Sequence, residues 1–201
     1  MARYSPSVQN LISKLSALPG VGSKSAQRLA FHILSMTDKE VQDLANSITD
    51  AHKLTVRCSC CQNFTDADPC PICTDTKRDT SIVCVVESPR DVSTFERTHE
   101  YNGLYHVLHG IFSPVAGKGM DDITLPQLIA RLQSHPEIKE VIVATNQTAE
   151  GNATALYISR LLSPSGIKVS RLASGLPMGS DIEFTDDLTL ANALKGRIEI
   201  G

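Results

Sequence analysis

Four cysteines of this chain stand at the spacing of a metal site. Cys58 and Cys61 form one Cys-x-x-Cys pair, Cys70 and Cys73 form a second, and eight residues separate the two pairs. Four thiolates brought together by two tight turns match the donor set of tetrahedral zinc. Because protein fills all four positions and none is open to water, we expect one structural Zn²⁺ per chain rather than a catalytic ion.

Other uses of these cysteines remain open at this point. An iron–sulfur cluster also takes four thiolates, and a single Cys-x-x-Cys pair can act as a redox dithiol. No His lies between the first and last cysteine of the set as an alternative ligand. Cys60 is off the usual pair spacing, and Cys84 lies in an apolar run, where we expect a small buried core residue. Metal analysis of the purified protein separates zinc from iron.

A turn with two glycines, Gly20 and Gly22, is the second pattern with chemical consequences. Glycine permits positive φ and a close approach to a ligand, and the N–H groups of the next helical turn point outward together. A phosphate suits such a nest, and Lys24 and Arg28, one turn apart, can close over it. The alternative is a tight turn that uses glycine for geometry alone. The surrounding string Leu-Pro-Gly-Val-Gly-Ser-Lys-Ser-Ala resembles the helix-hairpin-helix motif, which grips DNA backbones without reading sequence.

Charge is distributed unevenly along the chain. The net charge of −3 argues, taken alone, against a nucleic-acid partner. Residues 1–37, however, hold four Lys and Arg side chains and no Asp or Glu, whereas the chain from residue 58 onward holds 12 Lys and Arg against 18 Asp and Glu. This asymmetry favours a polyanion at the N-terminal end, although four charges on a solvated helix face are an equally simple interpretation.

Composition and the N-terminus bear on the compartment. A hydrophobic content of 41% and a charged content of 20% are typical of soluble globular proteins. The first residues lack the apolar stretch of a signal peptide, and no apolar run approaches membrane-spanning length. We therefore expect a cytoplasmic protein without membrane contact.

The elements that must position these residues form a helical segment and an α/β segment. Apolar residues at helical spacing predict three N-terminal helices, the second capped by Ser23 or Ser25 and the third by Thr37. Further along, strands and helices are expected to alternate, which predicts an α/β fold with a doubly wound parallel sheet. The expected strands are residues 81–86, 105–108, 141–144 and 167–172, and one helix is expected over residues 153–162.

Two carboxylates are expected at the carboxyl ends of these strands, where functional groups of such sheets gather. Glu87 follows the first strand, and Glu150 lies in the turn after the third. This pattern resembles the Toprim domain of topoisomerases and primases, which hold Mg²⁺ with a Glu and an Asp-x-Asp pair. Asn146 and Thr148 stand where those enzymes have the two Asp, and an amide and a hydroxyl are poor ligands for Mg²⁺. We expect neither bound Mg²⁺ nor catalysis; the alternative is a Mg²⁺-dependent nuclease or topoisomerase-like enzyme.

The order of these features is similar to that of the RecR family of bacterial recombination proteins over essentially the whole chain. The C-terminal strings Gly-Leu-Pro-Met-Gly and Thr-Leu-x-x-Ala-Leu-x-Gly-Arg add to the resemblance, whereas Gln147 and Asn152 stand where family members often have Pro and Glu. The resemblance implies a helix-hairpin-helix segment at 1–57, a zinc finger at 58–73, a Toprim domain at 81–176 and an oligomerisation tail at 177–201. The tail is expected to hold a short amphipathic helix that packs either on a neighbouring subunit or within its own chain.

The resemblance also implies a function. RecR proteins are non-enzymatic mediators of recombinational DNA repair: ring-like homotetramers that clamp DNA and act with RecO and RecF to help load RecA on gapped single-stranded DNA. By this resemblance Lys24 and Arg28 contact DNA phosphates without sequence preference, and Glu87 and Glu150 lie on the face where RecO docks. The protein is then expected at the nucleoid.

Overall fold

The computed structural model describes residues 4–113, 117 and 119–199. The chain divides into two compact units, Met1–Thr55 and Val56–Gly201. Within the described residues, no helix has both the length and the apolar character needed to cross a membrane.

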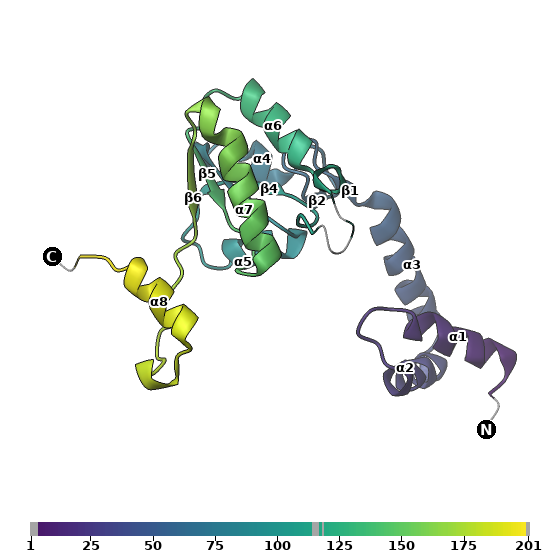
Figure 1. Cartoon of the computed structure of the whole chain (residues 1–201). Coiled ribbons are helices and arrows are strands. Elements are labelled where there is room, and N and C mark those ends of the chain that lie inside the picture. Colours follow the sequence, from purple (N-terminus) through teal and green to yellow (C-terminus); the bar gives the residue numbers. More distant parts are fainter. Residues whose placement is uncertain (1–3, 114–116, 118, 200–201) are drawn as a thin grey trace. The chain divides into compact units, whose positions relative to one another are not determined.

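The first unit is helical and contains α1 (Pro6–Ser16), α2 (Ser23–Ser35) and α3 (Asp38–Leu54) (Figure 1). The predicted cap of α3 is confirmed, because Thr37 and Glu40 form a reciprocal capping box. The predicted cap of α2 is wrong: Ser23 is already helical, and the N-cap is Gly22, which offers no side chain. The glycine turn therefore leads directly into the helix.

The core of this unit lies between α1 and α2. Ile12, Ala26 and Ala30 are buried at the centre, and apolar side chains of both helices surround them. Helix α3 has the apolar stripe that its sequence predicts, but none of its residues is buried. Val41 is 36% exposed and Ile48 is 65% exposed, so this stripe lacks a partner within the described part of the unit.

The second unit contains a two-stranded antiparallel ribbon and a four-stranded parallel sheet of order β4-β3-β5-β6. The ribbon pairs β1 (Val56–Arg57) with β2 (Phe64–Thr65), and α4 (Pro71–Thr74) follows it. The sheet and its helices are β3 (Asp79–Val86), α5 (Pro89–Glu96), β4 (Gly103–Val107), α6 (Leu125–Ser134), β5 (Glu140–Val143), α7 (Ala149–Leu162) and β6 (Lys168–Arg171).

Helices cover both faces of this sheet, which confirms the predicted α/β fold (Figure 1). On one face, Val83 and Val85 of β3 pack with apolar residues of α6 and α7. On the other face, Cys84 and Val86 pack with Val92 of α5, and Ile72 of α4 joins this cluster. Successive residues of a strand point to opposite faces, so the β-branched run of β3 is buried from both sides.

Helix α7 begins at Ala149, four residues before the predicted start at residue 153. Thr148 is its N-cap, and the threonine hydroxyl accepts a hydrogen bond from the N–H of Gly151 at 3.1 Å. A side chain at Gly151 has no room, because a Cβ there would lie 2.1 Å from the carbonyl oxygen of Asn146. The prediction that Glu150 lies in a turn is therefore wrong, since this residue is on the first turn of a helix.

The tail holds the short helix that its sequence predicts, α8 (Asp187–Lys195), preceded by the 3-10 turn η4 (Ile182–Phe184). Asp186 caps α8 by accepting a hydrogen bond from the N–H of Thr189 at 2.9 Å. Neither element contains a buried residue. The tail instead leaves a series of large apolar side chains more than half exposed: Met178, Ile182, Phe184, Leu188, Leu194 and Ile198.

Candidate functional site

The four predicted metal ligands lie together. The sulfur atoms of Cys58, Cys61, Cys70 and Cys73 are all within 4.8 Å of one another. The ribbon β1–β2 positions the first pair, since the N–H of Cys58 donates to the carbonyl of Asn63 at 2.8 Å. The second pair flanks the start of α4, whose first residue is a proline.

The spacing of the sulfurs fits a tetrahedral ion. Cys58 Sγ lies 3.9 Å from Cys73 Sγ, and Cys61 Sγ lies 3.6 Å from Cys70 Sγ. A tetrahedron with Zn–S bonds of about 2.3 Å has edges of about 3.8 Å. The N–H of Cys70 points at Cys58 Sγ from 3.3 Å, as is usual for a thiolate that binds a metal. The donor set is complete and holds three buried cysteines, so these residues fit a structural zinc ion.

Hydrogen bonds among the thiols of this cluster make them unequal acids in the absence of a cation. A hydrogen bond with Cys70 raises the pKa of Cys61 to about 12, and contacts with Cys61 and then Cys70 raise the pKa of Cys73. Hydrogen bonds with Cys61 and Cys73 instead lower the pKa of Cys70 well below its ordinary value. A bound divalent cation removes this difference, since a coordinating thiol loses its proton. Cys60 is not part of the set, and Cys84 is a buried core residue whose pKa burial raises to about 12.

The cysteine cluster is attached to the parallel sheet through its backbone. The N–H of Val107, at the end of β4, donates to the carbonyl of Cys61 at 2.8 Å. Nε2 of His109 lies 2.6 Å from the carbonyl oxygen of Gln62, which has a positive φ of 64°. Ile72 packs against both the cysteine cluster and the sheet. Residues 58–73, which carry the four cysteines and form the metal-site segment, are therefore attached to the carboxyl end of β4.

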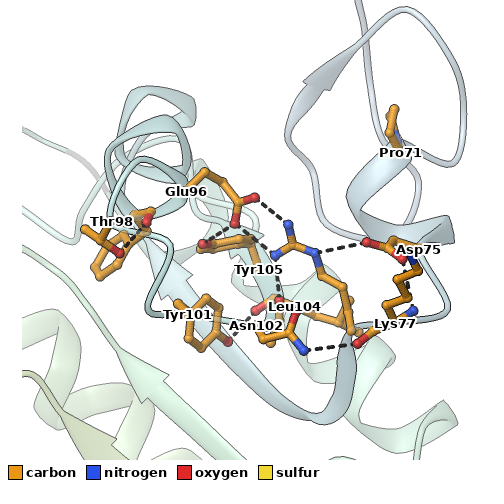
Figure 2. A network of polar contacts seen from close by, with 12 residues as sticks. Pro71, Asp75, Lys77, Glu96, Thr98, Tyr101, Asn102, Leu104 and Tyr105 are labelled. Atoms are coloured by element: carbon orange, nitrogen blue, oxygen red, sulfur yellow. Dashed lines mark hydrogen bonds and ion pairs between the residues drawn. The ribbon is translucent and has the colours of Figure 1, made fainter.

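A polar network forms a second attachment, and no sequence pattern predicts it. Arg78 forms two hydrogen bonds with the carboxylate of Glu96 on α5, one at 2.9 Å, and a third with the carbonyl of Gly103 at 3.1 Å. Tyr105 donates to the same carboxylate at 2.7 Å, and Asp75, just after α4, lies 3.9 Å from the guanidinium (Figure 2). The Arg78 side chain is only 12% exposed. Its partners come from separate elements and follow no periodic spacing.

The two glycines of the turn between α1 and α2 have different backbone conformations. Gly20 has a φ of 82°, in the left-handed region that favours glycine. Gly22 has an ordinary extended backbone, with φ −70° and ψ 162°. A Cβ at Gly22 would meet no atom within 4 Å, so nothing in the described structure requires glycine there. Lys24 and Arg28 follow on α2, and both are exposed.

The carboxylate of Glu87 is bound by the residue that replaces the first Asp of the Toprim pattern. The backbone N–H of Asn146 donates to Glu87 Oε1 at 2.6 Å, and the Asn146 amide donates to Oε2 at 2.7 Å. Arg171, at the end of β6, reaches the carbonyl of Asn146 from 3.4 Å. Thr148, at the second Asp position, caps α7. Among the described residues, no group of three His, Cys, Asp or Glu side chains gathers around Glu87 to share an ion.

Comparisons with protein families match four consecutive parts of the chain. A Toprim domain model matches residues 81–173. Three models described as parts of RecR match the rest: the helix-hairpin-helix at 8–52, the four-cysteine zinc finger domain at 55–75 and the C-terminal part at 175–198.

Full-length relatives agree with these matches. The chain is 54% identical to the recombination protein RecR of Heliobacterium modesticaldum, over 100% of both chains. It is 52% identical to RecR of Ligilactobacillus salivarius, over 98% of this chain and 100% of the relative. It is 49% identical to RecR of Clostridium perfringens, over 100% of both chains.

Proposed function

The chain belongs to the RecR family of recombination proteins, and from this membership we propose that it is a non-enzymatic mediator of recombinational DNA repair. In this proposal it binds gapped DNA without sequence preference and acts as a ring-like clamp at the bacterial nucleoid. With RecO and RecF, it helps RecA to load on the single-stranded gap.

The observation that carries the DNA-binding part is the open position of Gly22. Its backbone would tolerate any residue, and a Cβ would meet only open space. A glycine that the fold does not need is explained by a ligand that approaches its backbone closely. The N–H groups of the first turn of α2 have no partners within the helix, and they favour an anion beside Lys24 and Arg28. A DNA phosphate fits both features.

Gly22→Ala tests this proposal without disturbing the fold. We expect unchanged unfolding and an affinity for gapped DNA that falls about tenfold or more, because a methyl group displaces the phosphate. Gly119→Ala is the matched control, since Gly119 has an ordinary backbone and a Cβ there would lie 3.7 Å or more from its neighbours. Equal DNA affinity of Gly22→Ala and the unmodified protein would contradict the proposal.

The absence of catalysis is supported by the hydrogen bonds at Glu87. Both carboxylate oxygens are engaged by neutral donors of Asn146, and the second Asp position holds a threonine that caps a helix. Mg²⁺ prefers anionic oxygen ligands, and Asn146 and Thr148 replace the two Asp carboxylates of the Toprim pattern. Incubation with supercoiled, nicked and gapped DNA in Mg²⁺ tests the point. Cleavage or relaxation that Glu87→Ala abolishes would establish the enzyme alternative.

Self-assembly is supported by apolar surfaces that each unit leaves open. Helix α3 exposes Val41, Leu44 and Ile48, and the tail exposes Phe184 and Leu188 among others. Two separate apolar surfaces on one chain allow a closed ring in which each chain touches two others, and we propose a homotetramer. Light scattering tests it: Ile48→Lys and Leu188→Lys should each reduce the molar mass, and a monomeric unmodified protein would contradict it.

For RecO we propose the face that carries Glu150, on the exposed first turn of α7, together with Glu87, whose carboxylate lies close to Gly151 of the same turn. A carboxylate on a helix N-terminus is favourable for the fold and remains available to a basic partner. Glu150→Gln should weaken RecO binding in a pull-down and leave DNA affinity unchanged. Glu137→Gln, an exposed carboxylate before β5, is the control. Equal RecO binding by Glu150→Gln and the unmodified protein would place the partner elsewhere.

A further inference from the structure

The face of α2 that carries the two cations also carries an aromatic ring. Lys24, Arg28 and Phe31 are spaced four and three residues apart, so their side chains project from one side of the helix. Ala26 and Ala30 lie on the opposite side and are fully buried. Phe31 is 47% exposed, which is unusual for a phenylalanine that a small helical unit has room to bury.

This ring is held in place from the N-terminal side. The rings of Tyr4 and Phe31 meet edge to face, with centroids 5.3 Å apart and an interplanar angle of 69°. Tyr4 in turn packs against the core between α1 and α2. Tyr4, Lys24, Gln27, Arg28 and Phe31 together line one hollow on the surface of the first unit. The hollow thus combines two cations, an amide and a positioned aromatic ring.

We propose that this hollow takes an unpaired base of single-stranded DNA, with the base stacked on Phe31 and the adjoining phosphates on Lys24 and Arg28. The proposal rests on the proposed DNA-binding function and adds the class of strand that the turn prefers. Cations that follow a backbone, together with a ring on which a base stacks, are what single-strand binding requires. In a duplex both faces of a base are covered by its neighbours, so no base is free to stack on Phe31.

The charges around Phe31 favour this ligand over an apolar protein surface. Two cations and an amide line the hollow with the two aromatic rings, and residues 1–37 contain no Asp or Glu to neutralise them. An apolar partner would leave Lys24 and Arg28 desolvated without counter-charges, which is costly. A nucleotide supplies a phosphate for the cations and an apolar face for the ring.

The natural chain has four tyrosines but no tryptophan, so Phe31→Trp introduces a single tryptophan at the proposed stacking position, and its emission can be excited selectively. We expect a short oligothymidine to quench its emission strongly and a blunt duplex of equal length to quench it weakly. Phe184→Trp places the same fluorophore on the tail, where the natural ring is 83% exposed, and should show no such difference between the two ligands. Equal quenching of Phe31→Trp by the two ligands would contradict base stacking.

Affinity measurements then separate this inference from the function on which it rests. Phe31→Leu should lower affinity for the oligothymidine about tenfold and affinity for the duplex less than twofold, because the loss of one stacked base affects only the single strand. Phe31→Tyr should retain the single-strand affinity. If neither ligand binds the unmodified protein, the DNA-binding function itself fails. If both bind and Phe31→Leu alters only the molar mass in light scattering, Phe31 belongs to an interface between protein chains, and the stacking inference fails alone.

Discussion

Glu87 and Asn146 form a two-point contact in which the amide side chain and its own backbone N–H bind the two oxygens of one carboxylate, at 2.7 and 2.6 Å. The two residues follow neighbouring strands, β3 and β5, so the contact links these two strands at the edge of the sheet where their carboxyl ends lie. In a metal-dependent Toprim site, both residues would be anions around an ion. Here the amide of Asn146 is a donor to the carboxylate of Glu87.

Asn146→Asp replaces this contact by two facing carboxylates. The free energy of unfolding should fall by about 1–3 kcal/mol, because a hydrogen bond to a charged group is lost and like charges meet. Millimolar Mg²⁺ should recover part of the loss in Asn146→Asp and leave the unmodified protein unchanged in denaturant titrations. Asn152→Asp, an exposed change on α7, is the control. Equal stabilisation of the unmodified protein by Mg²⁺ would show that the natural edge already binds the ion.

The cysteine cluster predicts one zinc ion per chain and a structural role. Cys70→Ser should lose the metal and lower solubility and assembly, because residues 58–73 are too few to build an apolar core that could replace it. Cys60→Ser should retain one zinc per chain, since Cys60 lies outside the cluster. Elemental analysis decides between these outcomes. Stoichiometric iron in the unmodified protein, or full assembly of Cys70→Ser, would contradict the assignment.

Removal of Glu96 should destabilise the second unit by leaving Arg78 buried without its partner. We expect Glu96→Gln to lower the free energy of unfolding by about 2 kcal/mol, less than for a fully buried pair because the Glu96 side chain is 32% exposed. Hydrogen bonds from Arg78 lower the pKa of Glu96 below its ordinary value of 4.5, so the contribution is present above that pH and is lost as the pH falls further. Glu100→Gln, an exposed change beyond the end of α5, should have little effect in the same denaturation experiment.

His106 should make the second unit sensitive to mild acid. The ring is fully buried, Nε2 lies 2.9 Å from the carbonyl oxygen of Thr124, and Nδ1 has no hydrogen-bond partner among the described residues. Burial lowers the pKa of His106 from 6.5 to about 4, so the unfolded chain takes up a proton first. Stability should therefore fall by about 3 kcal/mol as the pH drops from about 6.5 to about 4.

The pH dependence is checked by chemical denaturation at a series of pH values. His106→Gln should be less stable at pH 7 but should lose less stability on acidification. A slope over this pH range that is identical in His106→Gln would assign the acid sensitivity to other groups.

The sequence predicts those parts of the protein in which a local pattern of residues is compatible with only one structural role. The Cys-x-x-Cys spacing predicts the thiolate cluster, the cap at Thr37 marks the start of α3, and the β-branched run of β3 predicts a strand buried on both faces. The predicted start of α7 is too late because an Asn-Gln-Thr string favours a turn. In the structure Thr148 is instead the N-cap of the helix.

Other features depend on contacts that no local pattern contains. Arg78 and Glu96 meet across 18 residues of chain, and only the packing of α5 beside the metal-site segment brings them together. Likewise, Gly20 and Gly22 look equivalent in the sequence, although only Gly20 has a positive φ. The backbone conformation is what turns Gly22 into a functional candidate.

The salt dependence of DNA binding shows whether the turn between α1 and α2 contacts DNA, because it counts the phosphates that the glycine turn and its two cations neutralise. The measurement compares the unmodified protein with Lys24→Ala/Arg28→Ala by fluorescence anisotropy on duplex DNA across a series of salt concentrations. We predict that the double variant binds all sequences more weakly, with a slope of log K against log salt that is shallower by about 1.8, from about 0.9 for each lost phosphate contact. An unchanged affinity and slope in the double variant would contradict it and remove the turn between α1 and α2 from the DNA interface.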